Sequence, residues 1–169
     1  MMAELDTITT AVRDALAAEV AGAVICEYPY GKKLRHDCPV VAVGIKSGSG
    51  ISSGFAEYMG EFYDAQRDTY SELYGKRMEL SLGVFIYSPK NQAYGAGACM
   101  TVFGQIAAAI STMPSGLRVH ELTCGETRFD AETGMFLCQA ELRCTAFMYA
   151  SRTCEEEFLS FTLRGAVSG

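Results

Sequence analysis

The stretch that most constrains the fold is MFLCQAELRCTAFMYA, residues 135–150, in which apolar and polar side chains alternate. Successive side chains of a β-strand point to opposite faces of its sheet, so this pattern predicts a strand with one face on a core. The apolar set is Phe136, Cys138, Ala140, Leu142, Cys144, Ala146 and Met148; the polar set is Gln139, Glu141, Arg143 and Thr145. The preceding segment DAETG, residues 130–134, ends in a glycine suited to positive φ and predicts a hairpin with an extended strand over residues 116–130.

Weaker patterns predict the remaining elements. We expect a helix over residues 3–21, where apolar side chains recur at helical spacing, at Leu5, Ile8, Val12, Leu16 and Val20. A second helix is expected over residues 93–113, ended by a proline and a glycine. Further strands are expected at residues 23–33, 38–48, 77–89 and 157–167, the first two forming a hairpin with a basic turn.

This order of elements predicts an α+β fold. We expect a mostly antiparallel sheet covered on one face by two helices. The chain has 169 residues, no internal repeat and no linker-like stretch. It therefore reads as one domain over residues 1–169.

Residues 49–75 do not fit either periodicity. The segment mixes glycine, serine and acidic residues with many aromatic ones, and we interpret it as a long projecting loop or arm. Exposed aromatic side chains lower solubility unless something covers them, and they are enriched at protein interfaces. They either fold back on their own domain or clasp a neighbouring subunit. The candidate interface residues are Phe55, Tyr58, Phe62, Tyr63, Tyr70 and Tyr74.

The glycines of YGAGACM, residues 94–100, could belong to a nucleotide-binding loop or to a closely packed helix. A Walker loop needs a Lys followed by Ser or Thr after the second glycine, and a dinucleotide fingerprint needs a third glycine; both are missing. We therefore favour close helix packing and expect no cofactor. A small-ligand domain or an enzyme using the Gly95–Cys99 turn remains an alternative.

Metal-binding and nucleophilic motifs are weak. His36-Asp37-Cys38 and His120-x-x-x-Cys124 lack the paired ligand spacing typical of zinc, and His120 is expected on the polar side of its strand. No GxSxG motif occurs, and nothing in the sequence orients Cys124 or Cys154 as a nucleophile. We expect neither a metal nor a catalytic site.

Net charge, hydropathy and cysteine content limit the classes of partner and the cellular compartment that we expect. The net charge of −6 argues against specific nucleic-acid binding, because an acidic surface repels phosphates. No apolar run is long enough for a membrane span, and the acidic N-terminal segment predicts a helix instead of a signal peptide. We expect a reducing cytoplasm, with most of the seven cysteines as packed thiols, including Cys26, Cys99, Cys138 and Cys144.

Three segments carry a resemblance to a known family. YGKRMELSLGVFIYSP, LTCGETRFDAETGMFLCQAELRCTAFMYA and EEEFLSFTLRGAV resemble small tail proteins of prophages and phage-derived contractile particles, and these are similar to tail terminator or minor tail proteins. The resemblance covers about residues 5–167 and fits residues 49–75 least well. It rests on patterns, so no site residue can be transferred.

The resemblance implies a structural subunit and no enzyme. It implies a homohexameric ring that caps the tail tube and ends its polymerisation, contacts the sheath in a contractile particle, and offers a docking surface for the head or its connector. The protein would then belong to a virion or phage-tail-like particle assembled in the bacterial cytoplasm. A head–tail connector or tail-completion ring is the alternative within assembly.

Overall fold

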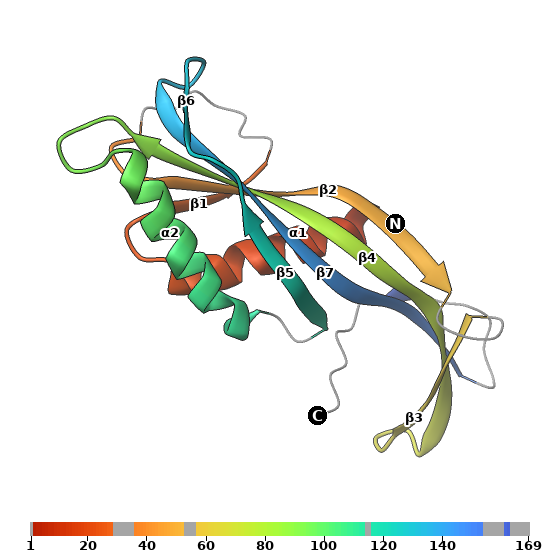
Figure 1. Ribbon diagram of the computed structural model, residues 1–169. Helices are drawn as coiled ribbons and strands as arrows, with labels where there is room; N and C mark the ends of the chain where they lie inside the picture. Colours follow the sequence, from red (N-terminus) through yellow and green to blue (C-terminus); the bar gives the residue numbers. More distant parts are fainter. Residues whose placement is uncertain (1, 29–35, 53–56, 114–115, 154–160, 163–169) are drawn as a thin grey trace.

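The computed structural model describes residues 2–28, 36–52, 57–113, 116–153 and 161–162 (Figure 1). Two long strands, β4 (Thr69–Pro89) and β7 (Met135–Thr153), pair antiparallel and form the centre of the sheet. The path through the sheet is β1 (Val24–Glu27), β2 (Val40–Ser52), β4, β7 and β5 (Leu117–Cys124). β3 (Tyr58–Asp64) pairs with β4, while β6 (Arg128–Asp130) and β8 (Phe161–Thr162) pair with β7.

The helices α1 (Met2–Glu19) and α2 (Ala96–Ala109) pack on one face of this sheet, and a short 3-10 turn, η2 (Ile110–Thr112), follows α2. The predicted α+β fold, with a mostly antiparallel sheet covered by two helices, is confirmed. The apolar stripe of α1 buries Ile8, Val12 and Leu16, and Val20 directly after the helix is also buried, as the spacing predicts. In α2, the buried residues are Cys99, Val102, Ile106 and Ala109.

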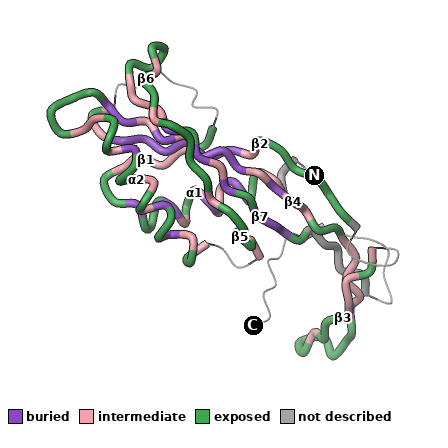
Figure 2. The backbone as a smooth tube through the Cα atoms, in the orientation of Figure 1, coloured by how far each residue is buried: buried purple, intermediate pink, exposed green. Residues whose placement is uncertain are grey.

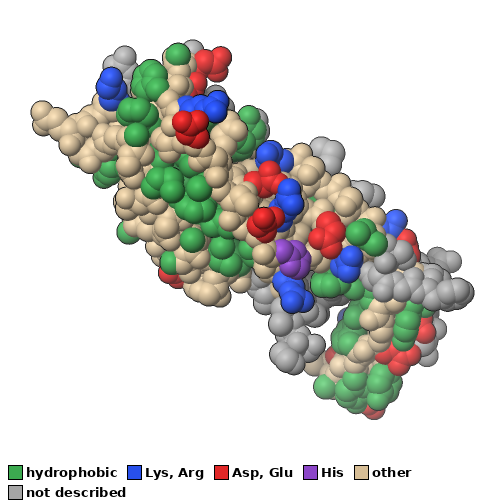
Figure 3. Space-filling view, viewed as in Figure 1, with side chains coloured by type: hydrophobic (Ala, Val, Ile, Leu, Met, Phe, Trp, Pro, Cys, Tyr) green, Lys and Arg blue, Asp and Glu red, His purple; other side chains and the backbone are tan. Residues whose placement is uncertain are grey.

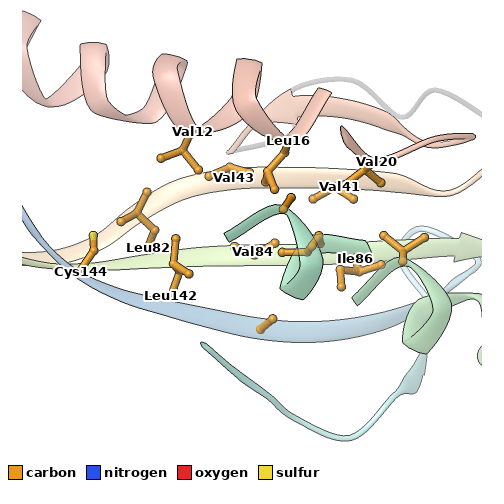
Figure 4. Packing of buried hydrophobic residues seen from close by; sticks show 14 of the residues in the cluster. Val12, Leu16, Val20, Val41, Val43, Leu82, Val84, Ile86, Leu142 and Cys144 are labelled. Atoms are coloured by element: carbon orange, nitrogen blue, oxygen red, sulfur yellow. The ribbon is translucent and has the colours of Figure 1, made fainter. Parts of the chain in front are cut away.

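The core lies between the helices and the adjacent half of the sheet (Figures 2 and 4). β7 contributes Cys138, Ala140, Leu142, Cys144 and Ala146, which confirms the predicted apolar face of this strand. β4 contributes Leu80, Leu82, Val84 and Ile86, and β2 contributes Val41 and Val43. The predicted turn before β7 is also confirmed: Gly134 has φ of 69° and donates its N–H to the carbonyl of Asp130.

Two sequence-based predictions are wrong. The strands near residues 24 and 40 do not form a hairpin: β1 pairs parallel with β2, with Val24 opposite Val40. The connection over residues 28–39 is long enough for a parallel arrangement, which a tight turn cannot make. The described part of residues 49–75 is also not an irregular loop, because β2 extends to Ser52, β3 covers Tyr58–Asp64 and β4 begins at Thr69, while residues 53–56 lie outside the described residues.

The long sheet extends past the helices. β2 and then β3 pair with the same edge of β4 and run in the same direction, so residues 40–64 and 69–89 act as one interrupted hairpin. Its far end, which we call the distal hairpin (residues 58–74), projects beyond both helices in Figure 1. The predicted strand over residues 157–167 is described only at β8, and the other residues of that range lie outside the described part.

Candidate interaction surface

The distal hairpin brings four of the predicted interface tyrosines onto one face. Tyr63 lies opposite Tyr70, and Tyr58 lies opposite Tyr74. The ring centroids are 5.1 Å apart in the first pair and 5.6 Å apart in the second, within the range of favourable aromatic pairs. The two pairs therefore stiffen the hairpin and present their outer surfaces together.

Two carboxylates lie between the tyrosine pairs. Glu61 is directly opposite Glu72, and alternation places both on the side of the sheet that carries the tyrosines. The Tyr74 hydroxyl donates to Glu72 Oε2 at 2.7 Å. Partial burial and the charges of Glu61 and Glu72 raise the pKa of Tyr58, so both carboxylates lie close to this ring. We call these six residues the acid–tyrosine face: Tyr58, Glu61, Tyr63, Tyr70, Glu72 and Tyr74.

Carboxylates within the turn of the hairpin stabilise its conformation. The Asp64 carboxylate accepts the backbone N–H groups of Gln66 and Arg67, which fixes the turn between β3 and β4. The Tyr63 hydroxyl donates to Asp68, and this bond raises the pKa of Tyr63. The aromatic rings are thus set in place before any partner arrives.

The acid–tyrosine face continues the core-facing side of β4. The β4–β7 register shows no shift from Ser71 to Pro89, so Tyr70, Glu72 and Tyr74 lie on the same side as Leu82 and Ile86. Near the helices that side is fully buried, whereas Tyr70 is 63% and Tyr63 50% exposed. Figure 2 shows the change from buried to exposed backbone along this strand. The core-facing side of β4 therefore continues beyond the cover of its own helices, where it carries tyrosines and carboxylates.

The structure places the predicted interface residues in different environments. Tyr58, Tyr63 and Tyr70 are exposed, and Tyr74 is half-buried on the same face. Phe62 is also exposed but lies on the opposite face, paired with Ser71. Phe55 lies outside the described residues.

The sequence analysis missed Glu61 and Glu72 as members of this face. The alternation in YSELY, residues 70–74, already places Tyr70, Glu72 and Tyr74 together. The matching pattern on the partner strand was hidden, because a register shift between Tyr58 and Gly60 breaks the period of two along β3. Figure 3 shows hydrophobic and acidic side chains gathered on this hairpin.

The Gly95–Cys99 turn has a different environment from the one predicted. A Cβ built on Gly95 or Gly97 meets no atom within 4 Å, so the expectation that these glycines allow close helix packing is wrong. They instead border a pocket of about 400 Å³, which also includes Tyr94, Thr101 and Gln105. Among the described residues, no charged side chain lines this pocket, and a phosphate group would need one or a dedicated backbone loop. The α2 helix is held by Ser88, whose hydroxyl donates to the Gly95 carbonyl.

The middle of the sheet face opposite the helices carries charged side chains that pair with one another. Lys46 Nζ lies 3.0 Å from Glu141 Oε2, and Arg143 bridges Glu141 and Glu121. Hydrogen bonds from Lys46, Ser81 and Arg143 lower the pKa of Glu141 to about 2. Figure 3 shows acidic and basic side chains interspersed across the middle of the molecule. Among the described residues of this region, mutual pairing of this kind leaves no concentrated charge for a phosphate backbone.

His120 lies on this polar face, as its strand position predicts. Thr145 donates its hydroxyl to Glu79 Oε2, so its oxygen accepts the Nε2–H of His120. This chain of bonds occupies the Nε2 atom of the His120 imidazole. Within the described ranges, no group of three or more His, Cys, Asp or Glu is placed to bind a metal.

The thiols of Cys99 and Cys144 are buried, and burial raises their pKa to about 11 and about 12. Cys138 is also buried, whereas Cys26 is only partly covered. Buried thiols with raised pKa values are poor nucleophiles. Among the helices that the structure describes, none is long and apolar enough to cross a bilayer.

Comparison of the chain with protein-family models gives no match, and comparison with curated proteins gives none either.

Proposed function

We propose that this protein is a structural assembly subunit that forms a ring with copies of itself and terminates a phage or phage-like tail tube. One observation carries the assembly part of the proposal: the core-facing side of β4 continues, as the acid–tyrosine face, beyond the helices of its own protomer. Exposed aromatic surface of this kind is typical of a contact with another protein.

A ring is favoured over a two-fold dimer by the shape of the subunit. A ring contact is heterologous: it joins two different surfaces of the same chain and closes by rotation. The distal hairpin is a projection at one end of the sheet, and the helix-covered body lies at the other end (Figure 1). A projecting element that reaches a neighbour's body fits such a head-to-tail contact.

The terminator role comes from the resemblance of residues 5–167 to phage tail proteins. It implies a hexamer, with the tail tube as a partner, the sheath as a further partner in a contractile particle, and a head–tail connector in a phage. The protein would act in a virion or phage-tail-like particle after assembly in the bacterial cytoplasm. The middle of the face opposite the helices suits a passive surface, since Lys46, Glu141 and Arg143 pair with one another there.

Ring formation is tested on the purified full-length chain by native mass spectrometry and electron microscopy over a range of protein concentrations. We expect a closed oligomer at high concentration and no thermal shift with nucleotides. A chain that stays monomeric at every concentration, and also in the presence of its tail tube protein, contradicts the proposal. A saturable shift with a nucleotide would instead support a ligand in the pocket beside Gly95.

The terminator and connector roles differ in the effect of deleting the gene in a producing strain. Loss of a terminator leaves tube growth unlimited, so tubes of variable and excessive length are expected. Loss of a connector leaves tubes of normal length that fail to join heads. Electron microscopy of the particles distinguishes these results, and normal, complete particles after deletion would contradict both roles.

A further inference from the structure

The middle of the sheet is open along both of its edges. On one side, β1 pairs with β2 only over Val40–Val43, and β3 pairs with β4 beyond the end of β2. Among the described strands, none pairs with the outer edge of β2 over residues 45–51. On the other side of the central strands, β5 pairs with β7 alone over Leu117–Cys124 (Figure 1). Each edge therefore presents backbone N–H and C=O groups with which a further strand can pair.

The two open edges lie at the same level along the strands and run in opposite directions. One row of paired residues crosses all four strands and consists of Gly48, Leu80, Cys144 and Val119. Because each neighbouring pair among β2, β4, β7 and β5 is antiparallel, β2 and β5 point in opposite directions. A second copy placed beside the first at the same level, by rotation about an axis along the strands, brings β5 and β2 together as antiparallel strands.

The side chains of the two edges are complementary in size. Residues 47–50 of β2 read Ser-Gly-Ser-Gly, and all four are exposed. Glycine in the interior of a strand weakens it and often marks the close approach of another backbone. Placed at the same level, Gly48 lies beside Val119 of the next copy, and Gly50 lies beside Leu117. A large side chain then meets an empty position in each row, whereas a second β2 strand would leave these positions unfilled.

The β2 edge lacks the features that usually block pairing between molecules. Exposed edge strands are typically protected by charged residues, prolines or bulges. Residues 47–51 contain no charged residue and no proline, and the bulge of β2 precedes them, between Ile45 and Ser47. β5 has its own bulge between Val119 and Glu121. Ser47 and Glu121 stand at the two ends of one row, so both bulges adjoin that row and bend the two edges at the same level.

From the direction, level and side-chain sizes of these edges we infer that β5 of one copy pairs antiparallel with β2 of the next copy, so that the sheet continues from subunit to subunit. The inference rests on the proposed self-assembly and supplies its main-chain contact. Two different edges meet, so the contact is heterologous and repeats around a ring. β3 lies on the same side of β4 as β2, so the distal hairpin approaches the same neighbour as the β2 edge.

Hydrogen exchange of the full-length chain, followed by mass spectrometry, tests the pairing. Samples are compared below and above the protein concentration at which the chain associates. In the oligomer, the outward-facing amides of residues 45–51 and 117–124 should exchange at least about tenfold more slowly, because new main-chain hydrogen bonds protect them. The turn residues 131–134 belong to neither edge strand and should exchange equally fast in both samples.

Proline substitutions test the main-chain contact directly. Ser49 and Gly50 are adjacent in β2, so the N–H of one points toward β4 and the N–H of the other points outward. Proline at the outward position leaves the β2–β4 hydrogen bonds in place, and thermal melting identifies that variant by its nearly unchanged melting temperature. It should weaken self-association at least about tenfold in sedimentation, because a donor of the new strand pair is lost. Ser49→Ala and Gly50→Ala keep both N–H groups and should associate like the wild type.

The outcomes separate this inference from the proposed function. A wild-type chain that never associates contradicts both. An oligomer in which either edge segment exchanges as fast as in the monomer contradicts the pairing of β5 with β2 and leaves ring formation standing. Protection of residues 45–51 alone would indicate a different partner for β2. A folded outward-proline variant that associates like the wild type also contradicts the pairing, and if both proline variants unfold, the exchange measurement on the wild type decides.

Discussion

Shortening the distal hairpin should abolish assembly without unfolding the domain. The variant replaces residues 59–73 with Asn-Gly, so that Tyr58 and Tyr74, which already face each other, flank a two-residue turn. It removes both carboxylates and the Tyr63–Tyr70 pair. None of the residues of the hydrophobic core lies between positions 59 and 73, so the packing under the helices is unchanged.

The magnitude follows from the exposed aromatic area. Tyr58, Tyr63 and Tyr70 are 39%, 50% and 63% exposed. With about 200 Å² per tyrosine side chain, they offer on the order of 300 Å² to a partner. Covering that area contributes up to about 7 kcal/mol at about 25 cal/mol per Å². The exposed area of these three side chains is more than a third of the roughly 800 Å² that each partner buries in a stable interface. Losing that area should weaken association by several orders of magnitude.

The assay compares oligomer mass and melting temperature in the same samples. We expect a monomer whose melting temperature falls by less than about 5 °C, since the strand pairing that is lost lies outside the hydrophobic core. A control variant replaces only the four turn residues 65–68 with Asn-Gly and keeps the tyrosines and carboxylates. The control should still assemble. A shortened variant that forms the same oligomer as the wild type would refute the role of the hairpin.

Three further predictions concern the fold itself. Leu142→Asp should prevent folding because this side chain is 1% exposed and a charge there has no partner, whereas Gln139→Asp on the exposed face of the same strand should melt normally; circular dichroism compares them. The pKa of Glu141 falls from 4.5 unfolded to about 2 folded, so its stabilising effect is present above pH 4.5 and is lost as pH falls toward 2. Glu141→Gln should therefore flatten the fall in melting temperature over that range, and an unchanged slope would contradict the pairing. Alkylation at pH 8 followed by mass spectrometry should modify the exposed Cys124 and spare Cys99 and Cys144 until the protein unfolds; equal labelling would show that these thiols are accessible.

The sequence predicted which sides of β7 and α1 face the core. Alternation in β7 and helical spacing in α1 depend only on local geometry, and a buried face leaves a continuous trace in the sequence. Leu142 and Val12 are buried for this reason. The identity of strand partners leaves no such trace, because any apolar strand face can pack on any other. The sequence analysis missed the parallel pairing of β1 with β2 for this reason.

The distal hairpin was missed for a second reason. An alternating pattern identifies a strand when one face is apolar and the other polar. Here Phe62 faces away from Tyr63, and both faces carry aromatic side chains. The register shift beside Gly60 then moves Tyr58 out of phase with Tyr63. The aromatic composition still indicated an interface, because enrichment in tyrosine does not depend on secondary structure.

The length of the central strands explains how such a projection keeps its shape. An isolated two-stranded hairpin is marginally stable in water. Here β4 has 21 residues and β7 has 19, and the two remain paired from the core to the distal end. At about 3.3 Å per residue, β4 spans about 70 Å as one element. The buried half of the sheet therefore anchors the exposed half. A contact surface carried on this extension is held at a fixed distance and angle from the body, which is what closing a ring of identical subunits requires.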